Sequence, residues 1–124
     1  MASGTGERPL GSIAEERTLL GVSAFAGAQY QLLASQTKRL VFEAGRNIGI
    51  LILNSNLDAK RAMYLFGSNT SGEFSGTRIK APTQSGLTVT FGTNEITITN
   101  GTSVLNVMVM MMNNNRPPTE VVVP

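Results

Sequence analysis

Two short segments of this chain, 87–91 and 95–99, alternate strictly between apolar and polar residues, and every polar residue in them except Glu95 is a threonine. They read "LTVTF" and "EITIT". Successive side chains of a β-strand point to opposite faces, so the alternation predicts two half-buried strands whose apolar side chains face inward. Residues 92–94, "GTN", join them, and a glycine-containing linker of that length is typical of a hairpin loop.

The chain shows similar strand patterning from about residue 28 onward. The other segments are "AQYQLLA" (28–34), "KRLVFEAG" (38–45), "NIGILILNSN" (47–56), "AMYLFGSN" (62–69), "TRIKAP" (77–82) and "SVLNVMVMMM" (103–112). Segment 47–56 is apolar on both faces, which indicates a buried strand. Residues 67–76 are expected to form a turn-rich loop. Asn100-Gly101 is expected to be a hairpin turn, because Asn-Gly between two apolar runs is a strong hairpin signal.

These segments predict an all-β fold. About seven or eight short, closely spaced strands are typical of an antiparallel β-sandwich or barrel, and we expect a jelly-roll-like sandwich. The length of 124 residues fits one domain, and we assign the sandwich to residues 21–113.

The two ends of the chain are expected to lie outside this sandwich. Residues 1–20 are predicted to be a flexible arm or a short helix, because "SIAE" at 12–15 has capping-box spacing. The arm could equally be extended and lie on a neighbouring subunit. Residues 114–124 are predicted to be an extended tail, since Pro117-Pro118 prevents regular pairing. The final "EVVV" could pair across a subunit boundary or fray.

Composition excludes several kinds of chemistry. Cysteine, histidine and tryptophan are absent, which removes disulfides, thiol chemistry and histidine-based metal sites. The eight acidic residues form no calcium-binding motif, and the glycines form no phosphate-binding motif. We therefore expect no catalytic residues, cofactor or metal. A signal peptide and a membrane span are not expected either, because no suitable apolar run is present.

Basic residues outnumber acidic ones in the middle of the chain, where seven lie between Lys38 and Lys80 against three carboxylates. They are interpreted as solvated loop and edge positions, or alternatively as a contact surface for an anionic polymer or glycan. The candidates for that contact are Arg39, Arg46, Lys60, Arg61, Arg78 and Lys80, together with the loop aromatic Phe74. Nucleic acid is not an expected partner, since no binding motif accompanies these residues.

The last apolar run has two apolar faces. Leu105, Val107, Val109 and Met111 share one face, and Met108, Met110 and Met112 share the other. The strand could be central and buried inside the monomer. Alternatively, since one small sandwich has one interior, the second face could contact another subunit. We expect Met108, Met110 and Met112 to lie in a subunit interface.

Segment 87–112, with its threonine-alternating strands, Asn-Gly turn and closing apolar strand, resembles the C-terminal heads of phage tail fibres and related virion proteins. The similarity covers roughly residues 36–112. It implies a trimeric β-sandwich that binds a host surface polysaccharide and contacts other virion proteins. Such a protein would be made in the host cytoplasm and assembled into the virion.

A decoration or cement protein on a capsid fits a short chain with an arm nearly as well as a fibre head. The main hypothesis is therefore a non-enzymatic, oligomeric virion structural protein acting in host attachment or capsid decoration. A monomeric carbohydrate-binding module is the alternative, and it would require exposed aromatic residues on one sheet face. An enzyme is the third possibility.

Overall fold

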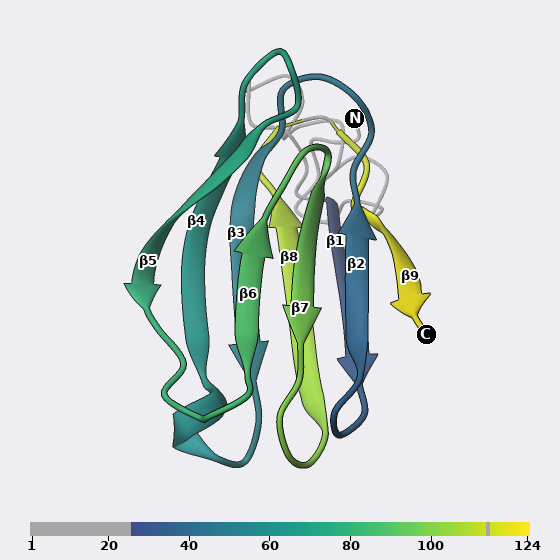
Figure 1. The fold of residues 1–124 in the computed structure, drawn as a ribbon. Coiled ribbons are helices and arrows are strands. Elements are labelled where there is room, and N and C mark those ends of the chain that lie inside the picture. Colours follow the sequence, from purple (N-terminus) through teal and green to yellow (C-terminus); the bar gives the residue numbers. More distant parts are fainter. Residues whose placement is uncertain (1–25, 114) are drawn as a thin grey trace, which may run out of the picture.

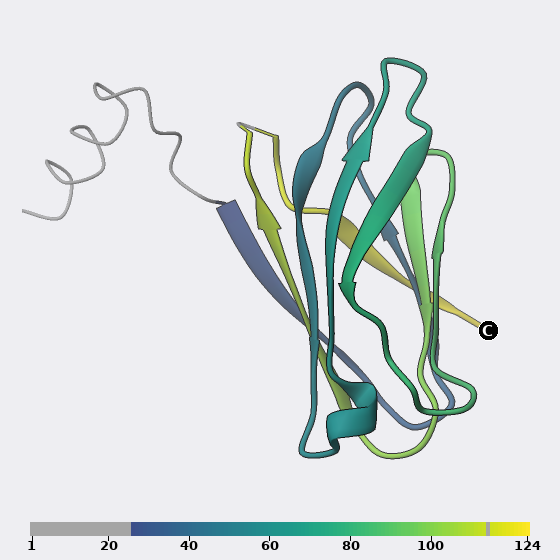
Figure 2. The same cartoon turned by 90° about the vertical axis from the view of Figure 1, so that its left-hand side faces the viewer.

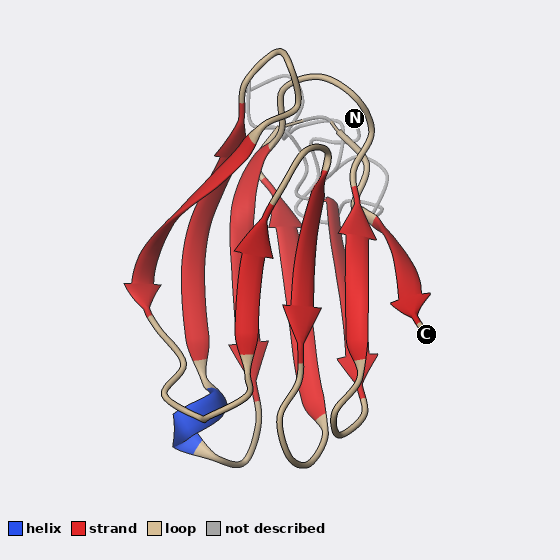
Figure 3. Cartoon of the chain, in the orientation of Figure 1, coloured by secondary structure: helices blue, strands red, loops and turns tan. Residues whose placement is uncertain are grey.

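The computed structural model describes residues 26–113 and 115–124 of the chain. This part is built almost entirely from strands (Figure 3). In chain order the elements are β1 (Ala26–Leu32), β2 (Thr37–Val41), β3 (Ile48–Asn54), the 3₁₀ turn η1 (Asp58–Lys60), β4 (Ala62–Ser68), β5 (Phe74–Lys80), β6 (Thr88–Phe91), β7 (Glu95–Thr99), β8 (Leu105–Met111) and β9 (Thr119–Val123). The only helical element among the described residues is this single turn, so they include no helix that could cross a membrane.

The strands form two antiparallel sheets that pack face to face (Figures 1 and 2). Sheet A has five strands in the order β1-β8-β3-β4-β5, and sheet B has four in the order β6-β7-β2-β9. The predicted all-β sandwich is confirmed. Its nesting is jelly-roll-like, because β1 pairs with β8 in one sheet while β2 pairs with β7 in the other. β3 then lies between β8 and β4, and β3, β4 and β5 form a meander.

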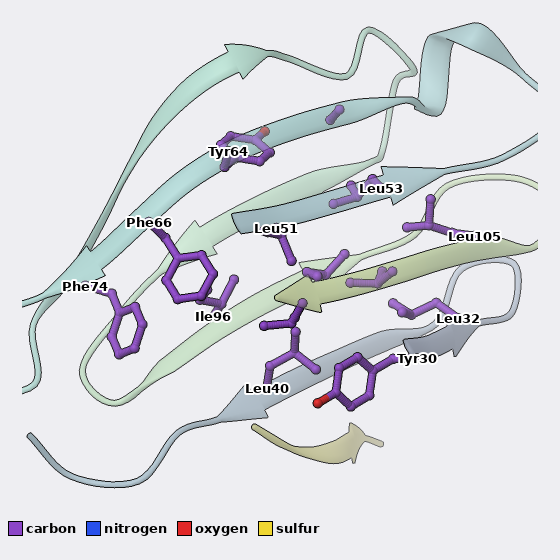
Figure 4. Packing of buried hydrophobic residues seen from close by; sticks show 14 of the residues in the cluster. Tyr30, Leu32, Leu40, Leu51, Leu53, Tyr64, Phe66, Phe74, Ile96 and Leu105 are labelled. Atoms are coloured by element: carbon purple, nitrogen blue, oxygen red, sulfur yellow. The ribbon is translucent and has the colours of Figure 1, made fainter. Parts of the chain in front are cut away.

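The core lies between the two sheets and follows from the alternation of each strand. Leu105, Val107, Val109 and Met111 on β8 are at most 1% exposed, so this face fills the sandwich as predicted. Leu40, Ile96 and Ile98 contact them from sheet B. Figure 4 shows Leu105 of β8 and Leu40 and Ile96 of sheet B among the side chains that fill the space between the layers.

Aromatic rings fill the end of the core where β2 ends and β5 begins. Phe74 packs on Phe42 with ring centroids 4.7 Å apart and on Phe66 at 5.9 Å. At the side where β5 approaches β6, the Phe91 ring lies directly over Gly76, where a Cβ would come within 2.2 Å of Phe91 Cζ. The absence of a side chain at Gly76 therefore lets the two sheets close along this edge.

Two predicted turns differ from those in the structure. Asn100-Gly101 is not a hairpin turn, because β7 and β8 belong to different sheets and residues 100–104 cross between them. Asn100 is buried at this crossing, where its amide donates to the carbonyl oxygens of Leu32, Leu33 and Ser103. The loop predicted at 67–76 is shorter, since β4 continues to Ser68 and β5 begins at Phe74.

The C-terminal segment contributes a ninth strand to the sandwich. β9 pairs with β2 over five residues, from Thr37 opposite Val123 to Val41 opposite Thr119. The preceding Pro117-Pro118 lies outside the strand, and the Pro118 carbonyl accepts a hydrogen bond from the Tyr30 hydroxyl. Residues 1–20, where an arm or short helix is expected, lie outside the described residues.

Candidate interaction face

The outer surface of sheet A is apolar across three neighbouring strands. The strand register places Met110 of β8 beside Ile50 of β3, and Ile50 beside Leu65 of β4. In the next row along the strands, Ile52 of β3 likewise lies between two apolar residues, Met108 of β8 and Met63 of β4. We call this surface the apolar face, and it consists of Ile48, Ile50, Ile52, Met63, Leu65, Met108, Met110 and Met112.

All eight side chains are accessible on the outside of the sandwich. Those in the middle of the face are half-buried by their neighbours, whereas Ile48, Leu65 and Met112 are 44%, 42% and 43% exposed. Isolated exposed apolar residues are ordinary, but a contiguous apolar surface marks an interaction site. Met108, Met110 and Met112 therefore lie where the sequence predicted an accessible second face. The subunit contact itself stays a prediction.

Polar but uncharged residues border the apolar face. On the β1 side the border is formed by Gln29 and Gln31. Where β3 ends and β8 begins it is formed by Asn54 and Asn106, which lie opposite each other. The strand rows through Met108 and Met110 include no charge until Lys80 on the edge strand β5, whose ammonium lies 3.0 Å from Asp58 Oδ1. An apolar centre with a polar rim is the usual anatomy of a protein–protein interface.

Two hollows indent the sheet where β1 meets β8. One, of about 300 Å³, is lined by Gly27, Ala28, Gln29, Met108 and Met110. The other, of about 310 Å³, is lined by Gln29, Ile52, Asn54, Asn106, Val107 and Met108. Because Gln29 and Met108 line both, the hollows are neighbours, and together we call them the β1–β8 groove.

The outer surface of sheet B has a different chemistry. Its threonines alternate with the buried isoleucines, and Thr37 and Thr99 share a hydrogen bond of 2.9 Å between their hydroxyl oxygens. Arg39 and Glu95 form an ion pair of 3.0 Å on the same surface. Apart from Val41 on β2 and Val121 and Val123 on the edge strand β9, this surface carries hydroxyl and charged groups, so the wide apolar face distinguishes sheet A from sheet B.

The basic residues proposed to contact a polymer are distributed over separate parts of the structure. Arg39 lies on sheet B, whereas Arg61 and Lys80 both approach Asp58, at 3.9 and 3.0 Å. Arg46 lines a hollow of about 640 Å³ whose other residues include Ile48 of the apolar face as well as Asn69, Glu73, Ser75 and Asn113. Arg78, on β5, lies opposite Tyr64 of β4.

Lys60 and Phe74 differ from their predicted roles as surface contacts. Lys60 is fully buried, and its ammonium donates hydrogen bonds to the carbonyl oxygens of Thr102, Ser103 and Val104. Burial lowers the pKa of the Lys60 amino group. Phe74 is 8% exposed, because β5 begins at this residue and points its ring into the core. Neither side chain is available to a ligand.

Five residues of the apolar face were not predicted as interface residues: Ile48, Ile50, Ile52, Met63 and Leu65. The sequence did show that segment 47–56 is apolar on both faces. It contained no signal that this segment lies next to the methionines, since that depends on the pairing of β3 with β8 across about fifty residues of chain.

Among residues 26–113 and 115–124 there is no group of three acidic side chains that could hold a metal ion. Comparison of the chain with models of protein families, with curated proteins and with solved structures finds no match. The function is therefore inferred from the apolar face and from the resemblance in the sequence.

Proposed function

We propose that this chain is a non-enzymatic structural protein of a virion, an oligomeric β-domain that acts in host attachment as a fibre head or in capsid decoration. The apolar face is the observation that carries the oligomeric part of this proposal. The virion part, and the preference for a trimer, rest on the sequence resemblance to phage tail-fibre heads. Other virion proteins and a host surface polysaccharide are the further partners that this resemblance implies.

Physical chemistry favours association through the apolar face. Removing one large apolar side chain from water contributes about 1.5–3 kcal/mol, and this face gathers eight partly exposed ones. The absence of charge in its central rows also suits contact between identical copies, because like charges would otherwise meet across the interface. Methionine adapts to irregular surfaces, which suits an interface residue.

The described carboxylates favour a structural role over a catalytic one. Asp58, Glu95 and Glu120 each pair with a lysine or arginine, and Glu73 accepts a hydrogen bond from the Asn69 amide. General acid–base catalysis by two carboxylates requires them to face a common substrate. Here each carboxylate is bound to a different part of the sandwich surface.

The aromatic residues within the described part of the chain favour assembly over monomeric carbohydrate binding. Tyr30, Phe42, Tyr64, Phe66 and Phe74 are buried in the core. Phe91 is half-buried and packs edge-on against Tyr64 at 5.6 Å. None of these rings offers a sugar an exposed flat surface on a sheet face.

Sedimentation velocity of the full chain and of two neighbouring lysine variants tests the oligomeric role. The full chain should sediment as a trimer or another small oligomer. Met110→Lys should remain folded and sediment as a protomer, because the charge falls on the apolar face. Met111→Lys is the matched control: it places the same charge in the core, where Met111 is 0% exposed, and should cost at least about 3 kcal/mol of folding stability.

A parent chain that sediments as a protomer at every concentration would overturn the oligomeric role. The virion role is tested separately, by mass spectrometry of purified virus particles. Peptides of this chain should be found in multiple copies per particle. Their absence from particles would leave a self-associating domain with a role elsewhere.

A further inference from the structure

The shape of the β1–β8 groove favours one kind of binding partner for the apolar face over another. Gly27 lies opposite Met110 in the strand register. A Cβ at Gly27 would be in ordinary contact with the Val109 carbonyl oxygen, at 3.5 Å, and Gly27 lines the hollow beside Met108 and Met110. Interfaces pack as densely as protein interiors. A flat second sheet would bridge these hollows, whereas a segment with protruding apolar side chains would fill them.

The sequence immediately before β1 contains such a segment. Residues 12–25 read "SIAEERTLLGVSAF" and include Ile13, Leu19, Leu20, Val22 and Phe25. β1 begins at Ala26, directly after this segment, and Gly27 of the groove is the next residue. The apolar side chains and the groove they could fill therefore belong to neighbouring parts of the chain.

The segment is long enough to reach a neighbouring copy. Fourteen residues span at most about 46 Å, at roughly 3.3 Å per residue. A five-stranded sheet is only about 19 Å wide between its outer strands, with neighbouring strands about 4.8 Å apart. A segment that leaves the edge strand β1 can therefore extend past its own sheet and along the sheet of another copy.

We propose that residues 12–25 of one copy bind in the β1–β8 groove of the next, so that the copies are joined by exchanged N-terminal segments. This inference rests on the proposed oligomeric function. A segment bound to its own groove would cover the face without linking copies. A segment bound to a neighbour covers the face and links the copies in one contact.

Disulfide trapping in the full chain tests this directly, because the chain contains no cysteine. Leu20→Cys in one protein and Gln29→Cys in another, mixed and oxidised, should form a mixed disulfide-linked pair. Thr88→Cys replaces Gln29→Cys in the control mixture, since Thr88 is exposed on the opposite surface. The control should give at least tenfold less of the linked pair.

A chain that carries both Leu20→Cys and Gln29→Cys separates the two possible arrangements. Exchange between copies should link these chains into multimers. Closure within one chain, at the mass of a single protomer, would overturn the exchange. A full-chain oligomer that forms no mixed disulfide would also overturn it, while leaving the oligomeric function intact. A full chain that sediments as a protomer would instead overturn the oligomeric function.

A charge variant gives an independent measurement. Leu19→Asp combined with Leu20→Asp in the full chain should shift sedimentation from oligomer to protomer. Ser3→Asp combined with Thr5→Asp adds the same charge earlier in the chain and should leave the oligomer unchanged. Equal sedimentation of the two variants would contradict a role for Leu19 and Leu20 in the contact.

Discussion

Buried polar side chains hold the loops of this sandwich in place. Lys60 donates to three carbonyl groups of residues 102–104, and Asn100 donates to the carbonyl groups of Leu32 and Leu33, where β1 ends. Tyr30, two residues before the end of β1, does the same for the C-terminal segment, because its hydroxyl donates to the Pro118 carbonyl. A buried polar group without a partner costs about 1–3 kcal/mol, so these bonds specify which loops lie together.

Tyr30 should make the stability of the fold depend on pH in the alkaline range. Burial, with a smaller contribution from the Glu120 carboxylate, raises the pKa of Tyr30 to about 12. In the unfolded chain the phenol loses its proton near pH 10. Between these values the unfolded state binds fewer protons than the folded state, so the free energy of unfolding falls as pH rises. The total fall from this residue is up to about 3 kcal/mol, at about 1.4 kcal/mol per pH unit.

Urea unfolding of the parent and of Tyr30→Phe at pH 9 and pH 11.5 measures this effect. At pH 9 the free energy of unfolding of the variant should be about 1 kcal/mol lower than that of the parent, because the hydrogen bond is lost. Between pH 9 and pH 11.5 the free energy of unfolding should decrease less in the variant than in the parent. Tyr64 is present in both proteins, and burial raises its pKa too, so its contribution cancels in the comparison. An identical decrease in the two proteins would contradict the assignment to Tyr30.

Among the strands, β9 is held by a few specific contacts. None of its five side chains is fully buried. Besides its pairing with β2, β9 carries Glu120, whose carboxylate lies 2.6 Å from the Lys38 ammonium. Lys38 is 7% exposed and also donates to the Gln31 carbonyl on β1. The Lys38–Glu120 pair thus links β9 to the edge of the other sheet.

Glu120→Gln should loosen β9 selectively. It leaves the ammonium of a buried lysine without its carboxylate, which we expect to cost about 1 kcal/mol, because Glu120 is partly exposed to water. Hydrogen exchange of the β9 amides should become faster, while that of the central strand β7 stays unchanged. Glu95→Gln, which breaks the more exposed Arg39 pair on the same sheet, is the control and should have little effect. Equal protection of β9 in both variants would show that strand pairing alone holds it.

On the scale of the whole molecule, the sandwich has one mostly polar outer surface and one mostly apolar outer surface. Sheet B presents threonines and the Arg39–Glu95 pair, while sheet A presents the apolar face. Such a molecule is expected to be most stable when sheet A is covered. Folding and association should then be linked, since a partner that binds only the folded state stabilises it by mass action.

This linkage predicts a melting temperature that depends on protein concentration. Across a hundredfold dilution, the melting temperature of the parent chain should fall measurably, because dilution dissociates the copies. The Met110→Lys variant, which should already be a protomer, should melt at a temperature independent of concentration. Differential scanning fluorimetry or calorimetry at several concentrations measures both. A parent whose melting temperature is constant would contradict the linkage.

The sequence by itself determined the strands and the two-sided character of segment 105–111, because both result from the period-two alternation of neighbouring residues. This alternation alone assigned Leu105, Val107, Val109 and Met111 to one face of the strand and the accessible methionines to the other. The pairing partner of each strand could not be derived in the same way: Asn100-Gly101 has the local signal of a hairpin, yet it connects two sheets.

Only the tertiary structure decided which distant segments are neighbours. The register of β8 with β3 extended three methionines into an apolar face of eight residues, and the closure of the loops buried Lys60, a residue type that is normally exposed. Phe74 and β9 joined the sandwich for the same reason, since partners on β2 and in the core were available to them. Local alternation gives the direction of each side chain, but burial depends on what lies across the gap, and that is set by contacts between residues far apart in the chain.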